Sequence, residues 1–147
     1  MKMSTKGRYG LRAMVDLAMT SENGPVSIQS IAERQELSEK YLEQLLAMLK
    51  KAGLVKSIRG HQGGYLINGN PETISAGDIL RALEGDLTPV ECSGLEEESP
   101  CKAAKSCVTK YVWKRINDSM EEAVDGITLA ELMEQGRSIQ AGTEKPE

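Results

Sequence analysis

The three cysteines of this chain lie close together, at Cys92, Cys101 and Cys107, in an otherwise acidic segment. Three thiols cannot pair completely among themselves, because a disulfide uses two of them and leaves one over. Thiolates are the ligands that iron–sulfur clusters and zinc prefer. We therefore expect a metal or iron–sulfur site here. Zinc binding, thiol redox chemistry and cysteines without a chemical role remain as alternatives.

The composition predicts a mostly helical protein with an aliphatic core and no membrane anchor. The chain has 147 residues, of which 39% are hydrophobic, 27% charged and 3% aromatic. This length suits one ordinary domain, or a small domain with an appendage. No N-terminal segment resembles a signal peptide, and no apolar run is long enough to cross a membrane. We expect a cytoplasmic protein, because thiols stay reduced in that compartment and remain available to a metal.

The net charge of −4 is distributed unevenly along the chain. Residues 1–68 carry ten Lys and Arg against six Asp and Glu, whereas residues 69–147 carry eight against sixteen. A basic first half on an acidic chain is typical of a nucleic-acid-binding domain followed by a part that does not contact nucleic acid.

The first half has the pattern of a helix-turn-helix. Apolar residues at helical spacing predict a helix over 8–20, and Ser27 is a candidate N-cap for a short second helix. Ser38 is a candidate N-cap for a third helix over 40–51. Two short helices joined by a tight turn are typical of DNA-binding helix-turn-helix units.

Polar side chains at the start of the third helix could contact bases and phosphates, as recognition helices do. Gln44 suits adenine, and Lys40 suits guanine or a phosphate. Glu43 would face a groove lined by phosphates, where a carboxylate is unfavourable. It is therefore better suited to rejecting wrong sequences than to increasing affinity. A helix face that is only solvated is the alternative.

A hairpin follows the third helix and completes the pattern of a winged helix. Residues 54–58 and 65–67 read as strands around the glycine-rich turn 59–64. The glycines allow backbone to approach DNA closely, and Arg59 supplies a charge. A nucleotide-binding phosphate loop is excluded, because no Lys-Ser or Lys-Thr pair opens a helix after these glycines.

The second half reads as a connecting helix, a loop and a long helix. Ser75 is a candidate N-cap, and residues 86–100 form an acidic loop. A helix is predicted over 102–125, and we expect it to pack against its twin in a homodimer, with packing on its own domain as the alternative. Its apolar stripe recurs every four residues, at Ala104, Val108, Val112, Ile116, Met120 and Val124.

These patterns divide the chain into four parts. We expect a winged helix-turn-helix domain over 1–85 and a cysteine-containing sensor loop over 86–102. A dimerisation helix and a short terminal helix over 128–135 would occupy 103–136, and residues 137–147 would form an unstructured tail. No paired carboxylates form a catalytic pattern, and no nucleophile lies beside His61, so we do not expect an enzyme.

Several motifs follow one another in the order found in one group of bacterial regulators. They are STKGRYG at 4–10, LSEKYLEQL at 37–45, AGLV at 52–55, RGHQGGY at 59–65 and AGDI at 76–79. Over residues 1–125 the chain resembles the winged-helix transcription regulators that include IscR, CymR and NsrR, and it is most similar to the IscR type.

The resemblance implies a mainly α fold, with an N-terminal winged helix-turn-helix, a two-stranded wing and a long C-terminal dimerisation helix. It implies a homodimer that binds a pseudopalindromic operator in double-stranded DNA and controls genes of iron–sulfur cluster biogenesis. The residues that it assigns to DNA binding are Thr5, Lys6, Arg8, Ser38, Lys40, Tyr41, Glu43, Gln44, Ser57, Arg59, Gly60, His61, Gly63, Gly64 and Tyr65.

The resemblance also implies a [2Fe–2S] cluster held by the three cysteines and one histidine, and here the chain departs from the pattern. The histidine position is Lys110, and the chain's one histidine, His61, lies in the wing. A [4Fe–4S] cluster or zinc is the alternative cofactor, and a CymR-like regulator that acts through a protein partner without a cluster is the alternative function. Substitute fourth ligands are His61 or a carboxylate of Glu91, Glu96, Glu97 or Glu98.

Overall fold

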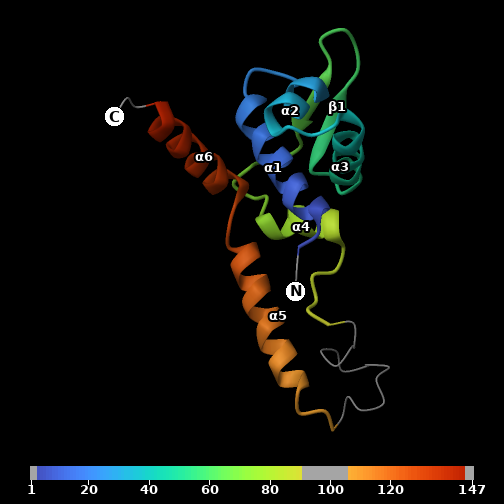
Figure 1. Cartoon of the computed structure of the whole chain (residues 1–147), viewed down its shortest axis with the longest axis vertical. Helices are drawn as coiled ribbons and strands as arrows, with labels where there is room; N and C mark the ends of the chain where they lie inside the picture. The colour runs from blue at the N-terminus through green and yellow to red at the C-terminus, as the bar shows by residue number, and fades with distance from the viewer. Residues whose placement is uncertain (1–2, 91–105, 145–147) are drawn as a thin grey trace.

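The computed structural model describes residues 3–90 and 106–144 (Figure 1). Within them it forms six helices and a two-stranded antiparallel sheet, which confirms the mainly α, winged-helix fold. The elements are α1 (Thr5–Thr20), α2 (Ile28–Gln35), α3 (Glu39–Lys51), β1 (Val55–Ile58), β2 (Gly64–Ile67), α4 (Ala76–Glu84), α5 (Lys110–Asp125) and α6 (Leu129–Glu144). None of the described helices is long and apolar enough to span a bilayer.

The helices of the winged domain begin at the serines that the sequence indicates. Side chains of Ser27, Ser38 and Ser75 accept hydrogen bonds from backbone N–H groups three residues onward. Each serine thereby satisfies one donor that the first helical turn leaves without an intrahelical partner. The three predicted N-caps are confirmed.

The core lies between α1, α2, α3 and α4. Burial of each large aliphatic side chain contributes about 1.5–3 kcal/mol, so these four helices stabilise one another. Leu129 of α6 extends the core on one side, and Val55 of β1 extends it on another. The other large side chains that are fully buried are Met14, Leu17, Ile31, Leu42, Leu45, Leu46, Leu49 and Ile79.

Helices α1 and α4 approach closely because two residues of α1 are glycines. A Cβ at Gly10 would overlap the side chain of Leu83, and one at Gly7 would overlap the carboxylate of Glu84. That carboxylate accepts hydrogen bonds from Ser4 N at 2.9 Å, Ser4 Oγ at 2.5 Å and Gly7 N at 3.1 Å. A negative charge at the N-terminus of a helix is stabilising, so Glu84 fastens the start of α1 to the end of α4.

The wing is attached to the body through the segment that precedes α2. Strand β1 pairs with β2 in antiparallel register, with Val55 opposite Ile67 and Ile58 opposite Gly64. Tyr65 and Val26 exchange backbone hydrogen bonds of 2.8 and 3.0 Å. The turn between the strands projects away from the helices (Figure 1).

Helix α5 begins later than the sequence predicts. Residues 106–109 form turns, and the helix starts at Lys110 rather than at 102. Residues 91–105 lie outside the described part of the chain. From its junction with α4, α5 extends away from the winged domain (Figure 1).

The end of the chain also differs from the prediction, which was wrong for residues 136–144. A helix that ends at Gln135 and an unstructured tail were expected, whereas α6 continues to Glu144. Glycine has low helix propensity, yet Gly136 does not end the helix. Its lack of a side chain instead allows α6 to lie against Met19 of α1, and Arg137 forms an ion pair with Glu22.

Candidate nucleic-acid interface and cysteine site

The start of α3 presents a polar surface. Ser38, Lys40, Glu43 and Gln44 are exposed, as the sequence predicts, because the opposite side of the helix carries the buried leucines. The preceding turn has no glycine. Glu36 adopts the left-handed conformation there, with φ of 54°, the one non-glycine residue with positive φ in the described chain.

Tyr41 is oriented differently from its exposed neighbours on α3. Its ring meets the Tyr9 ring edge-on, with 6.3 Å between centroids and an interplanar angle of 85°. Its hydroxyl is buried, with no hydrogen-bond partner in the described part of the chain. Tyr41 lies four residues before the buried Leu45, and this spacing indicates an inward orientation. In this structure Tyr41 attaches α3 to α1 and does not offer its hydroxyl to DNA.

The wing has a solvent-exposed tip and a base whose glycines lie against backbone atoms. Arg59, Gly60 and His61 are exposed at the tip, and Gly60 has φ of 118°, which favours glycine. Any side chain at Gly63 would overlap the Ile58 carbonyl, and one at Gly64 would overlap the Val26 backbone.

Ser57 and Tyr65 of the wing have structural contacts. Ser57 Oγ accepts a hydrogen bond of 2.7 Å from Lys50 Nζ, which links the wing to α3. Tyr65 is half-buried and pairs with Val26. These two residues hold the wing against the body.

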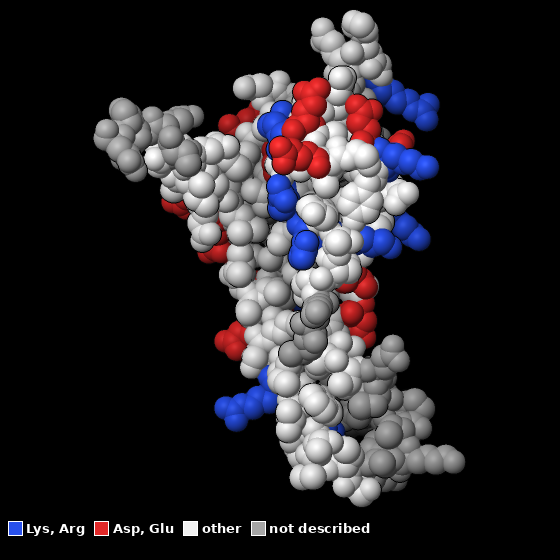
Figure 2. All heavy atoms as spheres, viewed as in Figure 1, with Lys and Arg blue, Asp and Glu red and all other residues white. Residues whose placement is uncertain are grey.

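Basic side chains project from one edge of the molecule, over α3 and the wing (Figure 2). Lys40 and Arg59 were predicted from the sequence. Three further lysines that were not predicted are also exposed on α3 and β1: Lys50, Lys51 and Lys56. The signal was available as four lysines and an arginine between positions 40 and 59. Such a cluster attracts the phosphate backbone of nucleic acid.

The first turn of α1 extends this polar surface. Thr5, Lys6 and Arg8 are exposed, as expected for backbone contacts. The guanidinium carbons of Arg8 and Arg12 lie 5.7 and 5.6 Å from the centroid of the Tyr9 ring. Through Tyr9 and Tyr41, this turn lies beside the start of α3.

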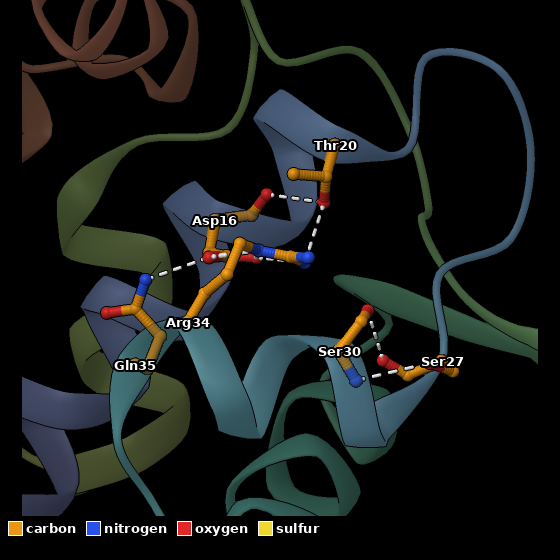
Figure 3. Close-up of polar contacts among 6 residues, drawn as sticks. All are labelled: Asp16, Thr20, Ser27, Ser30, Arg34 and Gln35. Carbon is orange, nitrogen blue, oxygen red and sulfur yellow. Dashed lines mark hydrogen bonds and ion pairs between the residues drawn. The ribbon is translucent and has the colours of Figure 1, made fainter. Parts of the chain in front are cut away.

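A buried carboxylate fixes α2 against α1 (Figure 3). Asp16, only 9% exposed, accepts a hydrogen bond of 2.8 Å from Arg34 Nη2 and another of 2.8 Å from Gln35 Nε2. The hydrogen bond with Asp16 raises the pKa of Arg34. This network was not predicted from the sequence, although a single acid within an otherwise apolar helix face was a signal for it.

Cys107 is half-exposed in the turn before α5, and its Sγ lies 3.0 Å from Thr109 Oγ1. The hydrogen bond with Thr109 lowers the pKa of the Cys107 thiol, and the backbone N–H groups of Lys110 and Thr109 and the Lys110 charge add to this effect. A thiol that ionises readily is suited to metal binding. Cys92 and Cys101 lie outside the described residues, as do Glu91, Glu96, Glu97 and Glu98.

The described residues alone do not form a metal site. In 3–90 and 106–144, no three Cys, His, Asp or Glu side chains are grouped so that they could hold an ion. Lys110 is the first residue of α5, and its Nζ lies 5.6 Å from the Tyr111 ring centroid. The wing turn with His61 and the start of α5 lie at opposite ends of the molecule, so His61 does not reach Cys107 of its own chain in this conformation (Figure 1).

The apolar stripe of α5 has two parts. Ile116 and Met120 line a hollow of about 430 Å³ together with Met3, Leu87 and Pro89. The other part faces solvent: Val108 is 74% exposed, Tyr111 65% and Val112 51%. Among the described members of the predicted stripe, Ile116 and Met120 therefore border their own chain, whereas Val108 and Val112 have no cover among the described residues. Ala104 lies outside the described residues.

Residues 3–135 match the model of the Rrf2 family, described as iron-dependent transcriptional regulators. The chain belongs to the Rrf2 family. It is 51% identical to the transcriptional regulator CymR of Bacillus subtilis, over 90% of this chain and 89% of that protein. It is 40% identical to the transcriptional regulator IscR of Aliivibrio salmonicida, over 90% of this chain and 77% of that protein.

Solved structures give the same assignment. The structure of CymR, the global cysteine regulator of B. subtilis, matches with a TM-score of 0.74 at 49% identity, over 92% of this chain and 98% of that one. IscR of T. potens matches with a TM-score of 0.76 at 46% identity, over 100% of this chain and 93% of that one. The resemblance stated from the motifs is confirmed, and as a member of the Rrf2 family this chain is a DNA-binding transcriptional regulator.

Proposed function

We propose that this Rrf2-family regulator acts as a cytoplasmic homodimer that senses iron–sulfur cluster status and binds a pseudopalindromic operator. The exposed start of α3, flanked by the wing and the first turn of α1, supports operator binding. Two winged domains related by a two-fold axis would read two half-sites in separate major grooves. We further propose that genes of cluster biogenesis are its targets.

The exposed part of the α5 stripe supports the homodimer. Tyr111 and Val112 of α5, a helix with no buried residue, form an apolar surface with Val108 in the turn before it. A second copy of α5 would cover this surface, because the same apolar residues would meet across a two-fold axis. Closed two-fold symmetry is the commonest arrangement of soluble oligomers.

Cys107 is the observation that supports the cluster. Its thiol has a lowered pKa and stands at the start of the helix that would form the dimer interface. Cys92, Cys101 and Cys107 supply three soft ligands, which suits a [2Fe–2S] cluster with a fourth ligand other than histidine at 110. When bound, such a cluster would report the availability of iron through its occupancy. Its binding at Cys107 would hold the turn before α5 in one geometry and shift the winged domains between conformations.

A regulator without a cluster, acting through a protein partner, is the second candidate. Lys110 favours it, because an ammonium group is not an iron ligand. A zinc or thiol redox site is a further variant of this candidate.

Anaerobic purification tests the cluster directly. We expect coloured protein with iron and sulfide in the stoichiometry of a [2Fe–2S] cluster, and we expect Cys107→Ala to lose the colour. Ser106→Ala is the matched control and should retain it. Colourless protein after cluster reconstitution, with or without zinc, would exclude the sensor and leave the second candidate.

A further inference from the structure

Two arginines of α1 lie against one tyrosine ring and have no acidic partner in residues 3–90 and 106–144. Arg8 and Arg12 each lie less than 6 Å from the Tyr9 ring centroid, at 5.7 and 5.6 Å. Like charges four residues apart on a helix repel each other and disfavour the helix. The stability of α1 does not explain this arrangement, whereas an anion between the two guanidinium groups would relieve the repulsion.

Four cationic side chains of the described chain pair with carboxylates. In residues 3–90 and 106–144, neither Arg8 nor Arg12 takes part in an ion pair. The pairs that do form are Arg34–Asp16, Arg81–Asp125, Lys114–Asp118 and Arg137–Glu22. The positive charge beside Tyr9 is therefore available to a ligand.

A relay from the buried carboxylate orients Arg12. Its Nε donates a hydrogen bond of 3.1 Å to Gln35 Oε1, and Gln35 Nε2 donates one of 2.8 Å to Asp16 Oδ2. The second of these bonds is drawn in Figure 3. Within the described chain Arg12 makes no other hydrogen bond, so both of its Nη groups remain available. A guanidinium group held in this way loses little conformational freedom when it binds a phosphate in its planar fork.

The cluster lies beside the recognition helix. Arg12 is 5.6 Å from the Tyr9 ring, which is 6.3 Å from the ring of Tyr41 in the first turn of α3. Recognition helices enter the major groove with their N-terminal residues, and phosphates line both edges of that groove. A phosphate bound by Arg12 would therefore lie beside the entry of α3.

We propose that Arg12, together with Arg8, binds a backbone phosphate of duplex DNA next to the recognition helix. The inference rests on the proposed operator binding and adds Arg12, which the family resemblance did not assign to DNA binding, to Arg8, which it did. Because a phosphate contact carries no sequence information, Arg12 contributes to affinity for every duplex and not to the choice of operator.

The salt dependence of binding to a mixed-sequence duplex tests this proposal, since the neutralisation of phosphates releases counterions. Arg12→Gln should reduce the magnitude of the slope of log K against log salt by about 0.9 for each phosphate that the protein no longer neutralises. Arg12→Lys keeps the charge and should keep the slope. Arg115→Gln removes an exposed arginine of α5 and serves as the control, with a slope equal to that of the unaltered protein. Thermal melting of each variant verifies that it is folded.

The outcomes separate this proposal from the proposed function. If the unaltered protein binds the duplex and folded Arg12→Gln has the same slope, the assignment of Arg12 is overturned and operator binding stands. If affinity falls with an unchanged slope, Arg12 acts through the structure of α3, which also overturns the assignment. If the unaltered protein binds no duplex, both proposals fail together.

Discussion

The four helices of the winged domain enclose side chains that are completely buried, whereas α5 has no buried residue. Both segments carry apolar residues at helical spacing, so their sequences look alike in this respect. The difference lies in what surrounds them: α1, α2, α3 and α4 cover one another, and the exposed side of α5 has nothing of its own described chain against it. The core of the winged domain is enclosed within the described chain, whereas the proposed dimer would supply the cover that α5 lacks there.

The largest expected effect comes from a charge on the exposed stripe of α5. Val112→Glu would bury a carboxylate without a partner in the dimer, at a cost of about 3–5 kcal/mol. We expect dissociation into monomers that retain the helical circular dichroism of the winged domain, measured by sedimentation velocity.

Lys114→Glu is the matched control, because Lys114 lies on the polar side of α5 in an ion pair with Asp118. It should leave the dimer intact. Monomers in the unaltered protein, or a dimer of Val112→Glu of unchanged affinity, would contradict the assignment of this stripe to the interface.

A smaller effect, on the free energy of unfolding, is expected when a methyl group is added to the core of the winged domain. Gly10→Ala would overlap Leu83, which is only 3% exposed and has little room to move. Overpacking of this kind costs about 1–3 kcal/mol, measurable by urea denaturation.

Gly142→Ala makes the same chemical change where no atom lies within 4 Å of the added carbon. At that position the better helix propensity of alanine should stabilise α6 by no more than about 1 kcal/mol. Equal effects of the two substitutions would show that α1 and α4 are less tightly packed than the structure indicates.

The smallest effect on stability is expected at the ion pair that joins the winged domain to α5. Arg81 lowers the pKa of Asp125 through hydrogen bonds of 2.7 and 3.0 Å that join α4 to α5. A lowered pKa in the folded state means that the pair stabilises the fold above the ordinary value of about 3.9 for an aspartate. This contribution is lost as the pH falls through the lowered pKa.

Thermal unfolding of Asp125→Asn should therefore occur at a lower temperature than that of the unaltered protein near neutral pH, and the difference should disappear in acid. The effect is small because both side chains are partly exposed. A difference that persists unchanged in strong acid would indicate that the carboxylate charge has no role at this junction.

Local patterns made most of the winged domain predictable. Serine caps and apolar spacing identify α2, α3 and α4 because each signal acts within one or two turns of a helix. The continuation of α6 past Gly136 was not predictable, since it depends on Met19, which lies far away in the sequence. The edge-on contact of Tyr41 with Tyr9 likewise joins residues that are distant in the sequence, and so does the hydrogen bond of Gln35 to Asp16.

The candidate sites were likewise predictable from the sequence only in part. Residue types and order identified the exposed start of α3 and the wing tip, and they indicated the chemistry of the cysteines. They did not show that Cys107 lies in a turn outside α5, because helix capping and thiol hydrogen bonds are decided by side-chain geometry. Arg12 was missed for a similar reason, since its setting is composed of residues from three helices.

The hydrogen bonds of Glu84 offer a way to observe the cysteine segment indirectly by NMR. The amide protons of Ser4 and Gly7 both point to this carboxylate, which ends the helix directly before that segment. Amide chemical shifts respond strongly to the loss of a charged acceptor. Two resonances from the first turn of α1 would therefore report any displacement of α4 that accompanies metal loading, without a label on the cysteines themselves.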